Sequence, residues 1–148
     1  MPSSARVYEH DVAHIGRASI DTTMPALTIG TPLVTVPIWT ELLLAKVNVL
    51  SVFDNGGDPP VISVGTNAPA YDNIIASILG DSVGATEINS GNLPMITPDL
   101  IGDPDASNNA EVDIYVKVTK DGGGAWQAPA GWANVTLVYH PGRGGDGR

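Results

Sequence analysis

The sequence predicts an all-β protein: an antiparallel β-sandwich of jelly-roll-like type, with one short helix and an extended N-terminal arm. Seventeen glycines, twelve prolines and only 16% charged residues are typical of many turns joining short strands, and not of surface helices rich in Glu and Lys. Apolar residues also alternate with polar ones in several segments, most clearly at residues 112–119. A Gly- and Pro-rich turn at residues 54–60 separates two further apolar runs. Strands joined by turns are therefore expected along most of the chain.

Residues 1–26 mix polar and apolar side chains without a sustained period. We expect an extended arm with one short strand, because a segment without its own core is stable only when it lies on its own sandwich or on a neighbouring subunit. The sandwich domain is expected at residues 27–140. The Gly-rich stretch 141–148 is expected to be a disordered tail.

Within the sandwich, residues 27–38 are β-branched but contain Pro32 and Pro37, so they are assigned to an edge strand or to strand ends. A long strand is predicted from about Glu41 to Phe53, buried on both faces at its far end, where Leu50 and Val52 face away from Phe53. Alternation predicts the remaining strands at residues 61–64, 93–97, 112–119 and 133–140.

One helix is predicted, at residues 72–79. Asp72 could accept hydrogen bonds from the free amides of a first turn, and Gly80 is a natural stop. Between them, four apolar side chains share one helical stripe: Ile74, Ile75, Ile78 and Leu79.

The length, cysteine content and net charge of the chain argue against several classes of function. A chain of 148 residues is most simply one domain, which buries roughly 70% of the surface of its unfolded chain. Cysteine is absent, so no disulfide contributes. The net charge of −9 repels a phosphate backbone, and no run approaches the roughly 18 apolar residues of a membrane span. We expect neither nucleic-acid nor membrane binding.

The motifs of catalysis and metal binding are incomplete. No serine lies in a Gly-x-Ser-x-Gly turn and there is no cysteine nucleophile, so we expect no enzymatic activity and no cofactor. His10 and His14 have the four-residue spacing of a metal site, but their neighbours form no amphipathic helix and exposed histidines are the favoured interpretation. The acidic loop 99–111 lacks the EF-hand register, which leaves calcium open only as another kind of site.

Aromatic residues are the other candidates for binding. Three tryptophans and two tyrosines could form a sugar-stacking platform or anchors for a protein partner, although at least one tryptophan is expected in the core. These are Trp39, Trp126, Trp132, Tyr8 and Tyr115.

Four landmarks in order resemble small β-sandwich virion proteins of tailed bacteriophages. They are a strand ending in Phe-Asp-Asn-Gly-Gly at residues 53–57, Val-Gly-Thr at 64–66, Tyr-Asp-Asn-Ile-Ile at 71–75, and Ala-Gly-Trp-Ala-Asn-Val-Thr-Leu-Val-Tyr at 130–139. The likeness covers residues 27–140.

The resemblance implies a structural virion protein, either a capsid decoration (cement) protein or a tail or fibre component. As a cement protein it would be made in the host cytoplasm, form a homotrimer and clamp the major capsid protein at the capsid surface through its arm. Deletion of residues 1–20 should then leave a folded domain that no longer binds capsids. The expected partner contacts are Val7, Tyr8, His10, Ile15, Trp126 and Trp132. The rival interpretation is a receptor- or carbohydrate-binding module, for which Trp126 and Trp132 should face solvent.

Overall fold

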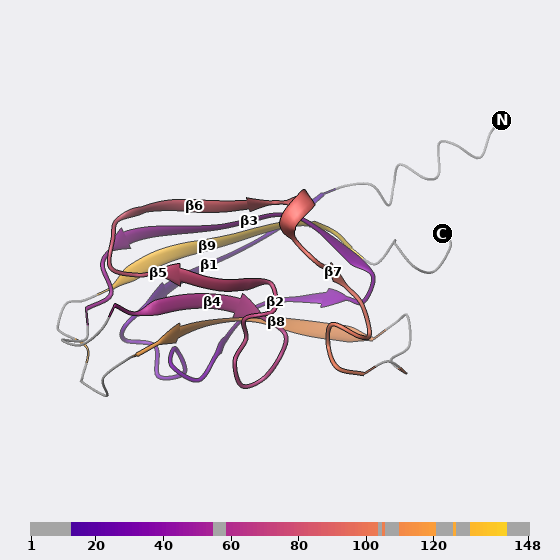
Figure 1. Ribbon diagram of the computed structural model, residues 1–148, viewed down its shortest axis with the longest axis horizontal. Helices are drawn as coiled ribbons and strands as arrows, with labels where there is room; N and C mark the ends of the chain where they lie inside the picture. The colour runs from indigo at the N-terminus through magenta and orange to yellow at the C-terminus, as the bar shows by residue number, and fades with distance from the viewer. Residues whose placement is uncertain are drawn as a thin grey trace.

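The computed structural model describes residues 13–54, 59–103, 105, 110–120, 126 and 131–141. These residues form two antiparallel sheets packed face to face (Figure 1). The strands are β1 (His14–Asp21), β2 (Thr31–Pro37), β3 (Thr40–Ser51), β4 (Val61–Gly65), β5 (Ile75–Leu79), β6 (Gly84–Asn89), β7 (Met95–Ile96), β8 (Glu111–Thr119) and β9 (Trp132–His140). The all-β sandwich is therefore confirmed.

Both sheets of the sandwich combine strands that are distant in the sequence. One sheet has the order β1-β9-β3-β6, with β7 added beside β3, and the other has the order β2-β8-β4-β5. The chain stays in one sheet between β4 and β5 and between β6 and β7, and it passes to the other sheet at all the remaining connections between consecutive strands. This alternation brings the first and last strands side by side.

The core lies between the sheets and follows from the alternation of side chains. In β8 the residues Ile114, Val116 and Val118 are buried while their neighbours are not, and β9 has the same pattern from Ala133 to Tyr139. Each fully buried Val, Leu or Ile stabilises the fold by about 1.5–3 kcal/mol relative to an exposed one. The tight packing of these side chains makes the sandwich a rigid support for its surfaces.

The predicted edge strand is confirmed as β2, which ends the four-stranded sheet. Proline has no amide hydrogen for a ladder, so Pro32 and Pro37 are tolerated where one side of the strand has no neighbour. The pairing of β2 with β8 also shifts register between Pro32 and Val34.

The predicted helix at residues 72–79 is wrong, because this segment contains strand β5. The pairing of β5 with β4 shifts register, so that Ala76 and Ser77 together lie opposite Ser63. This bulge puts two exposed residues between buried Ile75 and Ile78. Buried residues three apart imitate the period of a helix, which explains the error. Among the described residues the one helical turn is η2 (Ser90–Asn92), and no helix there is long and apolar enough to cross a membrane.

Strand β3 is predicted correctly in position but not in burial. Its inner residues Val47 and Val49 are buried, whereas Leu50 is 37% exposed and Val52, just beyond the strand, is 38% exposed. The outer side of this sheet carries no second layer in the described parts of the chain, which is why the apolar residues on that side remain in contact with solvent.

Strand β6 has no counterpart among the strands predicted from the sequence. It pairs with β3 from Gly84 to Asn89, but all its side chains except that of Ile88 are exposed. A strand with so little burial has no apolar alternation to reveal it. The short strand expected at residues 93–97 is β7.

Strand β1 begins close to the start of the described chain and is part of the sandwich. It pairs with β9 over all eight of its residues, and Ile20 is fully buried in the core. A deletion of residues 1–20 therefore removes most of a core strand along with the preceding segment.

Candidate functional site

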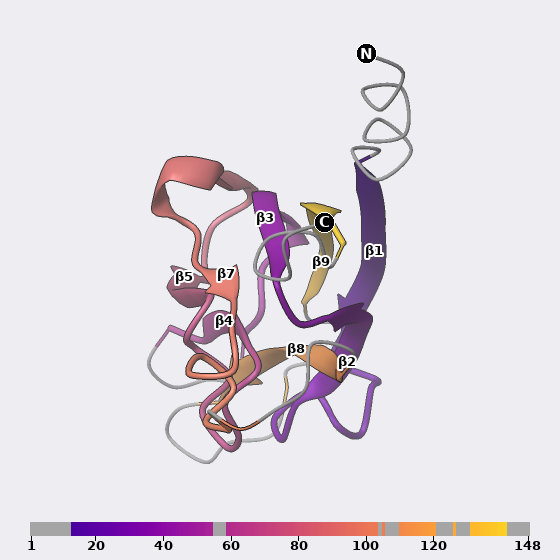
Figure 2. The ribbon, with the colours of Figure 1, turned by 90° about the vertical axis from the view of Figure 1, so that its right-hand side faces the viewer.

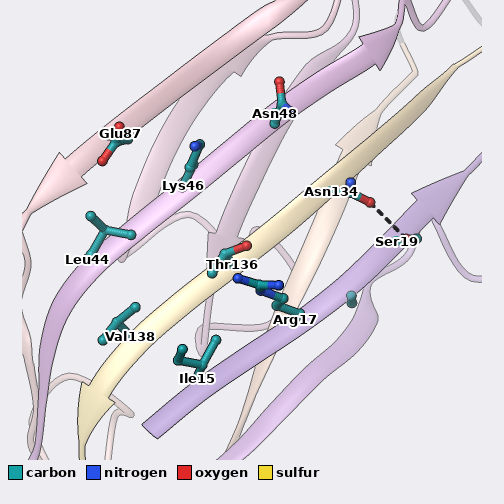
Figure 3. A pocket seen from close by; sticks show the side chains of 11 residues that line it. Ile15, Arg17, Ser19, Leu44, Lys46, Asn48, Glu87, Asn134, Thr136 and Val138 are labelled. Atoms are coloured by element: carbon teal, nitrogen blue, oxygen red, sulfur yellow. Dashed lines mark hydrogen bonds between the residues drawn. The ribbon is translucent and has the colours of Figure 1, made fainter. Parts of the chain in front are cut away.

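The candidate site is the outer face of the five-stranded sheet, where apolar, charged and amide side chains lie in separate rows. Register places its side chains in three rows across β1, β9 and β3. The apolar row is Ile15, Val138 and Leu44; the charged row is Arg17, Thr136 and Lys46, continued by Glu87 on β6; the amide row is Ser19, Asn134 and Asn48. Figure 3 shows these side chains side by side on the four strands.

These rows exist because inward and outward positions alternate along every strand. Ala133, Val135 and Leu137 point into the core, which leaves the intervening residues of β9 on the outer face. The twist of the sheet makes the face concave, and the rows line a shallow, open depression of about 600 Å³. Such a surface suits a broad partner better than a small enclosed ligand.

The charged row carries two cations in a chain of net charge −9. Arg17 and Lys46 flank Thr136 on neighbouring strands, which separates their Cα atoms by about 10 Å. Within the part of the chain that the structure describes, neither cation has a carboxylate within 4 Å, although Glu87 lies opposite Lys46. Their charges are therefore available to an acidic partner.

The amide row is held by a hydrogen bond across strands. Ser19 Oγ donates to Asn134 Oδ1 at 2.8 Å (Figure 3). This bond orients the Asn134 side chain beside Asn48 on the next strand. The row thus presents amide donors and acceptors in a fixed arrangement.

Two of the predicted contact residues, Ile15 and Trp132, lie on this outer face. Ile15 is 60% exposed at the end of the apolar row, and Trp132 is 48% exposed at the opposite end of β9. Val138, the neighbour of Ile15, lies six positions along β9 from Trp132, a span of about 20 Å. The two exposed apolar side chains therefore mark the two ends of the face.

Trp126 is placed differently from Trp132. Its ring contacts Phe53 edge to face with 6.0 Å between centroids, and Lys120 Nζ lies 5.4 Å from the ring centroid. It is half-buried against the core, which agrees with the expectation that at least one tryptophan serves in packing.

The remaining predicted contacts, Val7, Tyr8 and His10, lie outside the described residues, as does one of the two histidines weighed as metal ligands. The other, His14, is exposed and its ring lies 5.7 Å from that of Tyr139. No group of three or more His, Cys, Asp or Glu able to hold a metal ion occurs among the residues described, which include Asp99, Asp103 and Asp105 of the acidic loop.

One carboxylate next to the outer face is electrostatically distinct. The Thr23 hydroxyl and the Thr23 backbone N–H both donate to Asp21 Oδ1, and these hydrogen bonds lower the pKa of Asp21. Asp21 is paired with Trp132 in register and ends β1. It is therefore a fixed negative charge at the tryptophan end of the face.

Sequence reasoning identified Ile15 and Trp132 but missed Arg17, Lys46 and the amide row. The alternation of β3 and β9 indicates which residues point outward. It does not indicate which of them become neighbours, because register between distant strands leaves no local signal.

Comparison with known proteins bears on the fold. No protein-family model and no curated protein sequence matches the chain. Solved structures do match it, and three of them come from phage capsids. A chain in "Capsid of Ralstonia phage GP4" is 20% identical with a TM-score of 0.58, over 89% of this chain and 86% of that one. One in "Cyanophage Pam1 capsid asymmetric unit" is 15% identical with a TM-score of 0.53, over 87% and 84%.

The third match comes from "Acidic stable capsid structure of Helicobacter pylori bacteriophage KHP30". It is 9% identical with a TM-score of 0.53, over 89% of this chain and 90% of that one. This fold occurs in phage capsids. In each pair the two coverages are nearly equal, so the matching capsid chains are close to this chain in length.

Proposed function

We propose that this protein is a structural component of a phage virion that decorates the capsid and stabilises it. The observation that carries the proposal is the match, over nearly the whole of both chains, to small chains in three phage capsids. A rigid sandwich with a broad, differentiated outer face and no enclosed pocket on that face agrees with a docking role.

The outer face is the part that we assign to capsid contact. Its exposed apolar ends, Ile15 and Trp132, would be buried against the capsid, and Arg17 and Lys46 between them would meet acidic side chains. Each such contact is modest. Several copies joined in one assembly act at high effective concentration, so together they resist capsid expansion although each contact alone is weak.

Capsid occupancy tests the proposal. Lys46→Glu and Trp132→Ala are added to undecorated capsids, and the bound protein is counted after sedimentation. Removing an exposed aromatic anchor or reversing a facing charge should weaken binding by about tenfold or more. Lys117→Glu is the matched control, because it makes the same charge change on the outer side of the other sheet. Equal occupancy by all four proteins would contradict docking through this face.

A second candidate function, carbohydrate binding, is favoured by one observation. Trp132 is exposed on the same face as the amide row, and an aromatic ring beside side-chain amides is a surface on which sugars stack and form hydrogen bonds. Titration of polysaccharides against the unchanged protein and Trp132→Ala, followed by tryptophan fluorescence, separates the two functions. A saturable change that disappears in Trp132→Ala supports sugar binding, and no change across a broad panel excludes it.

A further inference from the structure

Strand β1 forms an open edge of the five-stranded sheet. Its eight residues pair with β9 without a register shift, and no described residue pairs with its other side. Figure 2 shows β1 standing at the outer edge of the fold. A long, regular edge of this kind exposes unpaired backbone donors and acceptors to any other extended chain.

The other edges are less suitable for pairing. Strand β2 contains Pro32 and Pro37 and a register shift, which protect an edge from further pairing. Strand β5 has five residues and a bulge, and β6 is a short strand that begins at Gly84. Strand β1 contains no proline, no bulge and no inward-pointing charge. Among the described strands, β1 is therefore the edge with the fewest features that hinder pairing.

The three rows of the outer face end on this edge and define what a pairing strand must carry. Ile15 ends the apolar row, Arg17 the charged row and Ser19 the amide row. A neighbouring strand would continue each row by one residue. An apolar residue is needed beside Ile15, an acid beside Arg17 and a polar residue beside Ser19, each two positions from the next.

The chain carries this pattern in its own N-terminal segment. Val7, Glu9 and Asp11 have the same spacing and the required characters, apolar, acidic and polar. They match when the segment runs parallel to β1 with an offset of eight residues. In an antiparallel arrangement with Glu9 beside Arg17, Asp11 would lie beside Ile15, so the parallel direction is favoured.

The alternate residues of the segment fit the inner side of the edge. With this offset Tyr8 lies beside Gly16, which has no side chain and packs so close to Val34 that a Cβ would lie 3.2 Å from it. An aromatic ring on the neighbouring strand covers the surface that an edge glycine leaves open. Tyr8 would thus shield the half-buried Val34 at the corner between the two sheets.

A tight hairpin within the same copy supplies this strand poorly. A hairpin onto β1 would run antiparallel, and a two-residue turn would fall on Val12 and Ala13, which lack the Gly or Asn that such turns need. It would also place Glu9 beside Gly16, facing the core. A second copy avoids both costs.

We propose that residues 7–11 of one copy add to the open edge of β1 in the next copy, parallel to it, with Glu9 paired to Arg17. The contact joins different surfaces of the two copies, so it repeats from copy to copy and forms a ring when the rotation between copies closes. A ring of three agrees with the homotrimer that the resemblance to phage virion proteins implies. The proposal concerns the isolated protein and does not depend on capsid binding.

A charge exchange within the full chain tests it. Arg17→Glu and Glu9→Arg, made singly and together, are compared with the unchanged protein by sedimentation at equilibrium. Each single variant puts like charges beside one another and should weaken association by about tenfold or more, whereas the double variant should restore it. Lys46→Glu is the control: it lies in the charged row but two strands from the edge, and it should remain trimeric.

Hydrogen exchange gives a second measurement on the same proteins. The amides of β1 should exchange more slowly in the unchanged trimer than in either single variant, and the double variant should recover the protection. Glu9 lies outside β1, so Glu9→Arg tests the pairing of Glu9 with Arg17 even if Arg17→Glu disturbs the strand. A monomeric unchanged protein, a single variant that stays trimeric, or a double variant that does not recover would each overturn the proposal.

Discussion

At the scale of single residues, one close approach in the core joins a glycine and Phe53, the largest fully buried side chain. Gly131 adopts a φ of +81°, and a Cβ added there would lie 2.3 Å from Phe53 Cδ1. Phe53 is 1% exposed, contacts Trp126 and cannot move without opening the core. Any side chain at position 131 therefore meets both an unfavourable backbone conformation and a steric clash.

Gly131→Ala should consequently lower the free energy of unfolding by about 2–4 kcal/mol, since overpacking costs about 1–3 kcal/mol and the backbone conformation roughly one more. Gly102→Ala is the matched control. Its φ is +78°, but nothing lies within 4 Å of the added Cβ, so only the conformational cost of about 1 kcal/mol applies. Urea denaturation of both variants measures the difference, and equal losses would show that Phe53 accommodates the methyl group.

The Asp21 carboxylate should make the stability of the fold depend on pH. Because the Thr23 hydrogen bonds lower its pKa in the folded state, the carboxylate contributes stability at pH values above about 4, its ordinary value in an unfolded chain. That contribution is lost as the pH falls from about 4 through the lower folded-state value. Denaturation measured between pH 6 and 2 should therefore show a smaller loss of stability in Asp21→Asn than in the unchanged protein. Parallel curves for the two proteins would contradict this assignment.

At the scale of elements, regular strands were predictable and irregular ones were not. Strands β8 and β9 follow strict alternation because the register shifts in their pairings place the extra residue on the partner strands β2 and β3, so the sequences of β8 and β9 show the strand pattern directly. Strand β5 contains a bulge, and β6 lacks burial, so the local pattern of each is misleading. The rows of the outer face depend on register between β1 and β9, where Ser19 and Asn134 are 115 residues apart. No local pattern encodes such a pairing.

The segment between β4 and β5 is held by Asn73, and this gives a prediction for the connection. The Thr66 backbone N–H donates to Asn73 Oδ1 at 2.8 Å, and Asn73 Nδ2 donates to Thr66 Oγ1 at 2.9 Å and to the Leu100 carbonyl at 3.0 Å. Asn73 thus joins the start of the bulged hairpin to a loop 27 residues away.

Asn73→Ala leaves these half-buried groups without their partner and should lower the free energy of unfolding by about 1–3 kcal/mol. Asn92→Ala, at an exposed position, should change it by less than about 0.5 kcal/mol. Thermal unfolding followed by circular dichroism compares them. A loss at position 73 no larger than that at position 92 would mean that the hydrogen bonds do not hold the connection.

At the scale of the whole molecule, the position of β1 decides where the N-terminal segment can be separated from the sandwich. The sequence placed the arm at residues 1–26, and that division stays a prediction. The structure pairs His14–Asp21 with β9 and buries Ile20, so the expectation that a chain lacking residues 1–20 folds normally has to be revised. Without β1, strand β9 becomes the edge, and the core loses a fully buried side chain.

Two deletions test this division. Removal of residues 1–12 keeps every described strand and should leave a cooperative thermal transition. Removal of residues 1–20 deletes a core isoleucine, worth about 2–5 kcal/mol, together with the β1–β9 ladder. Since about 1 kcal/mol corresponds to roughly 2–4 °C for a domain of this size, the longer deletion should lower Tm by at least about 10 °C or abolish the transition. If both deletions melt alike, β1 contributes little to the stability of the sandwich.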